Sequence, residues 1–235
     1  YSMHMVFSGS PGTGKTVVAK LFGQIMKDSG ILKEGRVISI SASSVKSMTN
    51  FSNIIESAYG SVLFIDEAYT LGPDAVAELI AQMENHRDEL IVILAGYSRH
   101  MQALLSSNPG FKSRIGEEIY FPDYSEEELL EIFKYMVIHR GMTIDDEALS
   151  CARDIFARIG KAGDQGNARY VRQIFEKVEG NQKIRLFNSF DDVSTIPDEE
   201  LIKINVSDFN DVAPLAPLAQ GTKDSAYYQK SSAEQ

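Results

Sequence analysis

The stretch from Gly9 to Thr16 reads Gly-Ser-Pro-Gly-Thr-Gly-Lys-Thr, and it constrains the fold more than any other part of the chain. The run His4 to Ser8 before it is largely apolar and predicts a buried strand. The segment after it carries apolar residues at helical spacing, namely Val18, Leu21, Phe22 and Ile25. A strand, a glycine-rich loop and a helix in this order form a phosphate-binding loop. The pattern therefore predicts that the chain binds a nucleotide.

The residue types of this loop fit the chemistry of a triphosphate. Glycines let the backbone turn tightly, so that successive N–H groups point at the phosphates from the positive end of a helix. Lys15 adds a mobile charge for the β- and γ-phosphates and is expected to act in catalysis, while the Thr16 hydroxyl is a ligand for Mg²⁺. The loop residues that we expect to bind the nucleotide are Pro11, Gly12, Thr13, Gly14, Lys15, Thr16 and Val17.

A second motif follows about 50 residues later, where the apolar run Val62 to Ile65 ends in Asp66 and Glu67. Four apolar residues in a row are typical of a parallel strand that is buried on both faces. We expect Asp66 to hold Mg²⁺ through water and Glu67 to polarise the water that attacks the γ-phosphate. In isolation the pair could equally be two solvated acids at the end of a strand. Together the two motifs have the character of Walker A and Walker B sequences, which predicts ATP and Mg²⁺ as cofactors.

The order of the elements predicts an α/β fold with a helical appendage. Further strand patterns at 36–41, 90–94 and 119–121 alternate with helical ones, which indicates a parallel five-stranded sheet flanked by helices. After Pro122 the pattern becomes helical, beginning with a capping box at Ser125 to Glu128. The predicted organisation is an α/β nucleotide-binding subdomain at 1–121, a small helical lid subdomain at 122–211 and a polar tail at 212–235.

Charge and composition narrow the class of partner. The formal net charge is −10, which disfavours a broad nucleic-acid footprint, because such binding needs clustered lysine and arginine. No apolar run approaches the roughly 20 residues of a membrane span, and we expect no signal peptide. The single cysteine, Cys151, cannot form an internal disulfide, which agrees with a reducing compartment. We therefore expect neither a membrane nor a nucleic acid as partner, and a cytoplasmic or organelle-stromal location.

Several motifs together resemble a known family. They are Gly9 to Thr16, Phe64-Ile65-Asp66-Glu67-Ala68-Tyr69, Ala95-Gly96-Tyr97, Asn108-Pro109-Gly110-Phe111-Lys112-Ser113-Arg114 and Phe121-Pro122-Asp123-Tyr124. With them the chain resembles an AAA+ ATPase, and within that superfamily the group that contains red-type Rubisco activase (CbbX) and stage V sporulation protein K. The resemblance extends from about His4 to Phe209, and its middle segments are distinctive for the group.

The resemblance implies an arginine finger at Arg114, which would reach the nucleotide of a neighbouring subunit. Charge builds up on the phosphoryl oxygens in the transition state, and such a finger raises the rate by roughly 10³–10⁵. A surface arginine in an ordinary ion pair is the alternative interpretation of Arg114. Lys112 and Arg99 are weaker candidates for the finger.

The resemblance also implies two sensor positions. Gly166-Asn167-Ala168-Arg169 is similar to the sensor-2 motif at the start of a lid helix, so that Arg169 would bind the nucleotide and report the γ-phosphate to the lid. Arg172, one turn further on, is the competing choice. Sensor 1 falls within Ala95 to Ser98, where either Tyr97 or Ser98 stands in for the usual asparagine.

The function implied is that of an ATP hydrolase that remodels a protein client, with Rubisco or another complex as the client. A finger that acts between subunits implies an oligomeric ring, and the expected ring is a hexamer. A slowly hydrolysing, nucleotide-dependent assembly switch is the alternative, and the net charge disfavours a loader or helicase acting on DNA. The family's aromatic-aliphatic-glycine pore loop is missing between Ser41 and Phe51, and the Leu71-Gly72 junction is short. The helices that precede the first strand in this superfamily and help to enclose the adenine are also missing. We therefore expect that this sequence either omits flexible residues or is a trimmed form of the natural chain.

Overall fold

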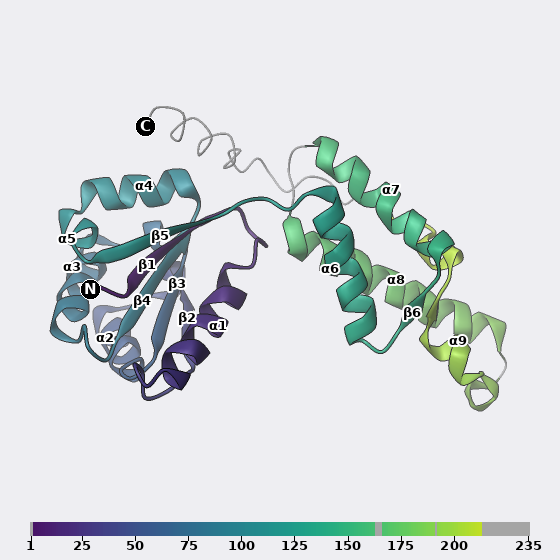
Figure 1. Cartoon of the computed structure of the whole chain (residues 1–235), viewed down its shortest axis with the longest axis horizontal. Helices are drawn as coiled ribbons and strands as arrows, with labels where there is room; N and C mark the ends of the chain where they lie inside the picture. Colours follow the sequence, from purple (N-terminus) through teal and green to yellow (C-terminus); the bar gives the residue numbers. More distant parts are fainter. Residues whose placement is uncertain (1, 163–165, 191, 213–235) are drawn as a thin grey trace. The chain divides into compact units, whose positions relative to one another are not determined.

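The structure is a computed structural model, which describes residues 2–162, 166–190 and 192–212. Its internal contacts divide the chain after Pro122 into an α/β unit and a helical unit (Figure 1). Among the described residues, no helix has the length and apolar character that crossing a membrane would require. The two units are described in turn.

A five-stranded parallel sheet forms the centre of the α/β unit. Its strands are β1 (His4–Gly9), β2 (Val37–Ser41), β3 (Val62–Asp66), β4 (Ile91–Gly96) and β5 (Ile115–Phe121). They lie in the order β2-β3-β4-β1-β5. The predicted fold class is therefore confirmed, and β1 lies between β4 and the edge strand β5, with its loop at the carboxyl edge.

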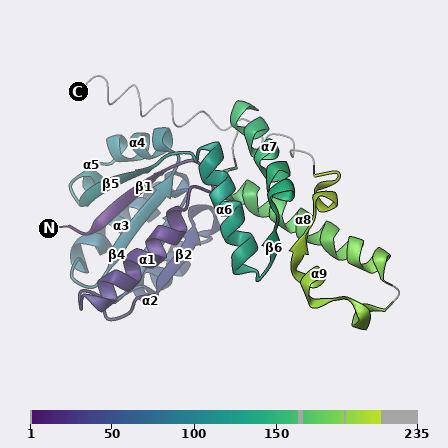
Figure 2. The same cartoon turned by 45° about the vertical axis from the view of Figure 1, so that its right-hand side comes forward.

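Helices cover both faces of this sheet, which Figures 1 and 2 show from two angles. They are α1 (Lys15–Asp28), α2 (Met48–Ser57), α3 (Pro73–Asn85), α4 (Ser98–Ser107) and α5 (Pro109–Lys112), with two short 3₁₀ helices, η1 (Ala42–Ser44) and η2 (Ala68–Thr70). Successive side chains of a strand point to opposite faces. Val6 accordingly packs in the core beneath α2 to α5, whereas Met5 and Phe7 pack on the side of α1. The arrangement has three layers.

The apolar pattern of α1 indicates only part of its contact with the sheet, where Phe22 packs against the core. The apolar residues Val18, Leu21 and Ile25 are 38%, 60% and 55% exposed, and the helix buries Ala19 and Gly23 against the sheet instead. A Cβ at Gly23 would lie 3.0 Å from Gly35 O and 3.1 Å from Val37 Cγ2. Only small residues allow α1 to approach the sheet so closely, and small residues do not produce an apolar periodicity in the sequence.

The segment from 98 to 121 differs from the sequence pattern in a second way. The apolar pattern does not indicate α4 or α5, and it predicts β5 only from 119, whereas the strand begins at Ile115. β5 is an edge strand, and its residues Gly116 to Ile119 are exposed. An edge strand without a buried face carries no apolar alternation, which explains the short prediction.

The helical unit contains α6 (Glu126–His139), α7 (Asp146–Ala162), α8 (Asn167–Ser189) and α9 (Asp198–Ile202), with η3 (Val193–Thr195) and η4 (Val206–Phe209). Two short strands, β6 (Thr143–Ile144) and β7 (Lys203–Ile204), pair in parallel. The predicted capping box opens α6, where Ser125 Oγ accepts from Glu128 N and Glu128 Oε2 accepts from Ser125 N. Phe133 lies at the centre of the core, with the rings of Phe156, Phe175 and Phe209 about it.

Polar contacts hold the end of this unit against α8. Arg185 donates from Nε to Asp208 Oδ1 over 2.9 Å and from Nη2 to Lys203 O over 2.9 Å, and its Nη1 pairs with Glu200. Val212, the first residue of the predicted tail, is buried against the same core. The rest of that tail, residues 213–235, lies outside the described residues. Cys151 is half-buried and packs against this core.

Candidate nucleotide-hydrolysis site

The phosphate-binding loop runs from the end of β1 into α1. Gly12 and Gly14 have φ values of 78° and 95°, a region that glycine enters without strain. Gly9 must also be glycine, because a Cβ there would lie 2.3 Å from Phe121 O of β5. No side chain caps the amino terminus of α1, and no acidic residue stands in its first turn. The backbone N–H groups of that turn are therefore suited to an anion.

Lys15 lies inside the loop. Its ammonium group donates to Gly9 O and to Ser10 O, each over 2.7 Å, and the side chain is largely buried. Thr13 Oγ1 donates to Ser10 O over 2.8 Å, which closes the same turn. The ammonium charge is thus already at the centre of the loop, where the phosphates of a nucleotide would lie. Thr16 and Val17 follow on the first turn of α1, half-buried and exposed respectively.

Asp66 and Glu67 stand where β3 ends, with Asp66 half-buried and Glu67 exposed. Glu67 adopts a left-handed conformation with φ 52°, which is uncommon for a residue with a side chain. Its N–H donates to Asp66 Oδ1 over 3.1 Å, and its carbonyl accepts from Thr70 N over 2.8 Å and from Thr70 Oγ1 over 2.9 Å. The turn at Glu67 is therefore held from both sides, and such backbone strain is typical of functional sites.

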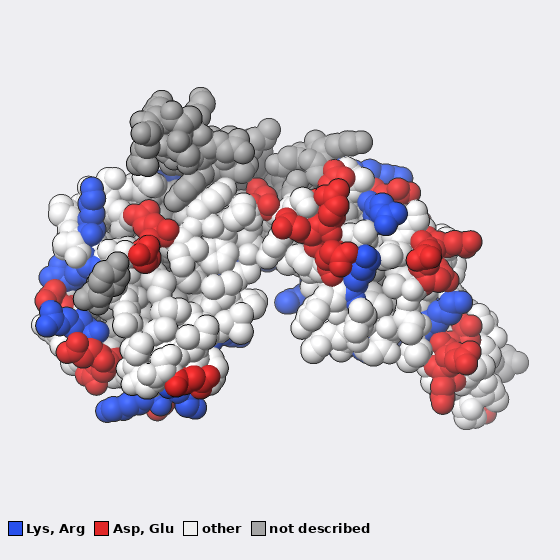
Figure 3. All heavy atoms as spheres, viewed as in Figure 1, with Lys and Arg blue, Asp and Glu red and all other residues white. Residues whose placement is uncertain are grey.

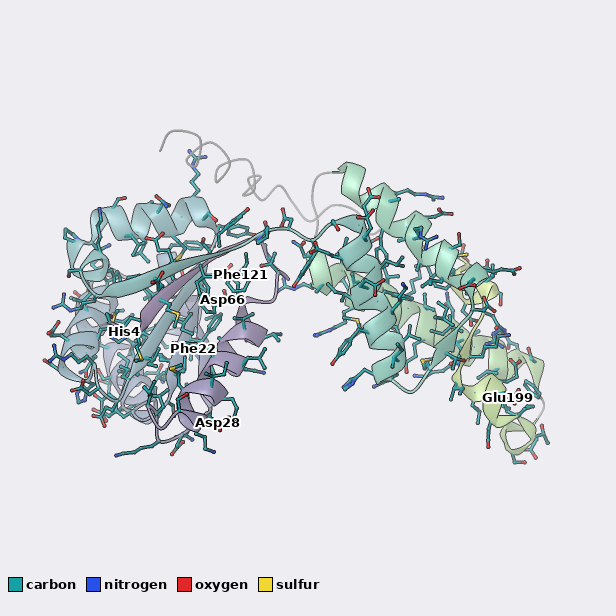
Figure 4. All side chains as sticks on the ribbon, in the orientation of Figure 1. His4, Phe22, Asp28, Asp66, Phe121 and Glu199 are labelled. Atoms are coloured by element: carbon teal, nitrogen blue, oxygen red, sulfur yellow. The ribbon has the colours of Figure 1, made fainter. Side chains whose placement is uncertain are left out.

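The strand order brings the two motifs to one edge of the sheet. β4 lies between β3 and β1, with Ile65 and Val6 both level with Leu94. Figure 4 labels Asp66 and Phe121 near this carboxyl edge and His4 near the opposite edge. Tyr97 and Ser98, the two sensor-1 candidates, follow β4 directly and so lie between the two motifs. Ser98 is fully buried and Tyr97 is half-buried.

Arg114 lies at the other edge. It directly precedes β5, whose first residue Ile115 pairs with His4, whereas Phe121 pairs with Gly9. At about 3.3 Å per residue, Arg114 is on the order of 20 Å from the phosphate-binding loop of its own chain. Its Nε is 3.0 Å from Glu84 Oε2, so the ion pair considered from the sequence is present. The weaker finger candidates, Lys112 and Arg99, are both exposed.

Arg169 lies in the first turn of α8 and is exposed, as is Arg172 one turn later. The start of that helix is fixed by Asn167, which is fully buried and has φ 47°. Asn167 Oδ1 accepts from Tyr124 N, and its Nδ2 donates to Asp123 Oδ1, each over 2.9 Å. The beginning of α8 is thereby tied to the first residues of the helical unit.

The donor set fits Mg-ATP better than a free metal ion. Within the described residues, no group of three or more histidine, cysteine, aspartate or glutamate side chains could hold a metal ion. Thr16 and Asp66 offer one hydroxyl and one carboxylate, and Mg²⁺ is usually bound by one or two such groups together with substrate phosphates. The residues present therefore suit an ion that arrives with its nucleotide.

Comparison with known proteins identifies the family. Residues 5–123 match the model of the ATPase family associated with various cellular activities (AAA), and residues 125–217 match the AAA lid domain. The chain belongs to the AAA family of ATPases. This membership confirms the predicted enzyme class, an ATP hydrolase, at the level of the family.

The relatives of this AAA ATPase fall in the expected group. It is 37% identical to the chloroplastic ribulose bisphosphate carboxylase/oxygenase activase of Cyanidioschyzon merolae over 91% of this chain and 76% of that protein. It is 37% identical to protein CbbX of Cereibacter sphaeroides over 80% of this chain and 66% of that protein. The ESX-1 secretion system protein EccA1 of Mycolicibacterium smegmatis is equally similar, at 38% identity over 88% of this chain and 40% of EccA1. The resemblance to the CbbX group is confirmed.

Two further comparisons bear on fold and length. RuvB from Thermotoga maritima superposes with a TM-score of 0.63 over 87% of this chain and 60% of RuvB, at 20% identity, which supports the AAA fold alone. The chain spans 64% of the length of protein CfxQ of Xanthobacter flavus, to which it is 38% identical over 80% of its own residues.

Sequence reasoning missed two polar residues of this AAA ATPase. Asn167 was included in the sensor-2 motif at the start of a helix without a role of its own, because a buried left-handed asparagine has no signature in a single sequence. Glu84 was not noticed at all, although an acid in the last turn of α3 is a signal, since a negative charge is unfavourable at a helix carboxyl terminus.

Proposed function

We propose that this chain hydrolyses Mg-ATP to remodel a protein client, working as a ring in which each nucleotide site is completed by a neighbouring subunit. The observation that carries the proposal is the division of charged groups between the two edges of one sheet. Lys15, Asp66 and Glu67 belong to the carboxyl edge, and Arg114 belongs to the amino edge. Each subunit then contributes to two nucleotide sites: the carboxyl edge of its sheet to its own site, and Arg114 to the site of a neighbour.

The chemistry follows from the groups at the carboxyl edge. Lys15 and the loop N–H groups bind the β- and γ-phosphates, and Glu67 polarises the water that attacks the γ-phosphorus while ADP leaves. Bound Mg²⁺, held by Thr16 and Asp66, supplies charge neutralisation of the phosphate oxygens. An arginine about 20 Å from its own loop cannot act there, so Arg114 serves the neighbour's nucleotide. Arg169 on the first turn of α8 reports the γ-phosphate to the lid.

The ring supports a mechanical role. Hydrolysis that is sensed by a helix of the lid gives the lid a nucleotide-dependent position, as in other ATPases with lids. The expected ring is a hexamer. On the face shown in Figure 3, acidic side chains are prominent over the helical unit and the described residues form no broad basic surface, which supports a protein rather than a nucleic acid as the client.

Relatives guide the choice of client. One relative is named a Rubisco activase, and another of equal similarity is a component of the ESX-1 secretion system. Chains of similar identity thus carry names from different systems. Rubisco is the first client to test, and stimulation of turnover by Rubisco in its inhibited form would support an activase role.

The decisive test is the substitution Glu67→Gln in the full chain. We expect ATP affinity to be retained, because the phosphate-binding loop is intact, and steady-state turnover to fall by about 10²–10⁴, the usual contribution of a catalytic base. The matched control is Glu118→Gln, which removes an exposed acid from the edge strand β5. Turnover of Glu67→Gln at the wild-type rate would remove Glu67 from the proposed role, and ATP binding by the wild-type chain without turnover would favour an assembly switch.

A further inference from the structure

The guanidinium of Arg114 is held by its own chain through two of its three nitrogens. Nη1 donates to Gly110 O over 3.1 Å and to Ser113 Oγ over 3.2 Å. Nε is buried and lies 3.0 Å from Glu84 Oε2, in an ion pair rather than a well-aligned hydrogen bond. Within residues 2–162, 166–190 and 192–212, Nη2 has no hydrogen-bond partner. The group is thus anchored on one side and open on the other.

The backbone of Glu84 is anchored through the packing of the last turn of helix α3. Glu84 follows Met83, which is 1% exposed and whose carbonyl accepts from Nε2 of the buried His4 over 3.0 Å. Ile80 lies one turn before Glu84 on the same face of α3, and a Cβ at Gly110 would lie 3.0 Å from Ile80 Cδ1. The last turn of α3 and the segment that ends in Arg114 therefore pack closely, which places the Glu84 backbone beside Arg114.

The Glu84–Arg114 pair is poorly explained as a device for stability. The Glu84 side chain is 51% exposed, and pairs of this kind are worth only about 0–1 kcal/mol. The last turn of α3 contains no basic residue, so the negative charge of Glu84 also opposes the helix dipole. What the pair does provide is a defined orientation of the Arg114 guanidinium. Glu84 holds the Nε side and Gly110 O holds Nη1, so that the plane of the group is constrained.

We propose that Glu84 is a positioning residue for catalysis in the neighbouring subunit: it orients Arg114 so that Nη2 is presented to the neighbour's γ-phosphate. This inference rests on the proposed function, since it assumes that Arg114 acts between subunits. Without Glu84 the guanidinium keeps its positive charge but loses its fixed orientation. A displacement of about 1 Å in a catalytic group costs on the order of 10²-fold in rate.

The experiment measures steady-state ATP hydrolysis by the full chain bearing Glu84→Ala. We expect kcat to fall about 10–100-fold while KM and the affinity for ATP stay unchanged, because the carboxyl edge of the same subunit is untouched. Glu84→Gln, which keeps an acceptor oxygen of the same reach, should recover part of the rate. The matched control is Glu78→Ala on the same helix, whose carboxylate bonds Gln82 rather than Arg114 and whose loss should leave kcat unchanged.

Mixing separates positioning from a structural defect. A Lys15→Ala subunit cannot bind ATP but carries an intact Glu84 and Arg114, so adding it to Glu84→Ala should raise turnover in mixed rings. If the defect of Glu84→Ala is confined to the subunit's own site, mixing will give no such recovery, and the proposal is overturned. A wild-type kcat for Glu84→Ala would also overturn it.

Arg114→Ala is assayed in parallel. If Arg114→Ala is inactive but Glu84→Ala is fully active, the positioning role of Glu84 is wrong and the arginine-finger role of Arg114 stands. If Arg114→Ala is fully active, Arg114 is not an arginine finger.

Discussion

A buried histidine fixes the amino edge of the sheet. The His4 side chain is 3% exposed, and its two ring nitrogens bond to different backbone groups. Met83 O can only accept and Val92 N can only donate, so Nε2 carries the proton and Nδ1 accepts, each over 3.0 Å. Burial lowers the pKa of His4 below its ordinary value of 6.5. Protonation of Nδ1 would also break the bond to Val92.

This environment predicts a pH dependence of stability. Because the pKa of His4 is lower in the folded than in the unfolded chain, the unfolded chain binds more protons in the interval between the two values. The contribution of His4 is therefore complete above about pH 6.5 and is lost as the pH falls through the folded pKa. The urea midpoint of the wild type should drop more between about pH 7.5 and pH 5.5 than that of His4→Gln. Equal slopes for wild type and His4→Gln would contradict the prediction.

At the scale of elements, the start of α8 depends on a single side chain. Asn167 adopts φ 47° and bonds through both ends of its amide to Asp123 and Tyr124. Asparagine tolerates the left-handed region better than most residues, and its buried amide satisfies two polar groups of the incoming chain. The orientation of the first turn of α8, which carries Arg169, is set by these two bonds.

Asn167→Ala should destabilise the helical unit by about 2–4 kcal/mol, because it removes the hydrogen bonds to Tyr124 N and Asp123 Oδ1 and because alanine tolerates the left-handed region less well than asparagine does. Asn167→Gly removes the same hydrogen bonds but accepts the backbone conformation, so it should cost about 1 kcal/mol less. Denaturant unfolding of both variants measures the difference. Equal losses for the two variants would mean that the left-handed backbone stores no strain.

At the scale of the whole molecule, the proposed ring makes one sheet serve two nucleotide sites. Its carboxyl edge carries the phosphate-binding loop with Asp66 and Glu67, and its amino edge carries Arg114 with Glu84. The proposed ring is required because no single chain can bring both edges to one nucleotide. Activity should therefore depend on assembly.

The turnover per subunit should rise with protein concentration until rings are complete, because each new contact supplies Arg114 to a bound nucleotide. Arg114→Ala should bind ATP normally and lose roughly 10³-fold in turnover at every concentration. When it is mixed with Lys15→Ala, which has an intact Arg114 but no functional phosphate-binding loop, part of the turnover should return. A turnover per subunit that stays constant on dilution to monomers, measured by steady-state assay and light scattering, would count against the ring.

The sequence by itself determined the strand–loop–helix unit, the acids after β3, the parallel sheet and the helical nature of the second unit. These features are local, because glycine spacing, uninterrupted apolar strands and the capping box at Ser125 depend on neighbours in the chain. The resemblance carried by the motifs at 64–69 and 108–114 added the family. The closest contacts of α1 with the sheet are made by the small residues Ala19 and Gly23, which leave no apolar periodicity in the sequence.

Only the tertiary structure decided which polar groups meet. Glu84 and Arg114 are distant in sequence, as are Asn167 and Asp123, and each pair forms because strand order and helix packing bring separate segments together. The register of β1 with β5 separates Arg114 from the phosphate-binding loop of its own chain. The spacing of the motifs in the sequence does not predict this distance. The sequence thus specified the chemical groups through short-range patterns, and long-range packing fixed their distances and directions.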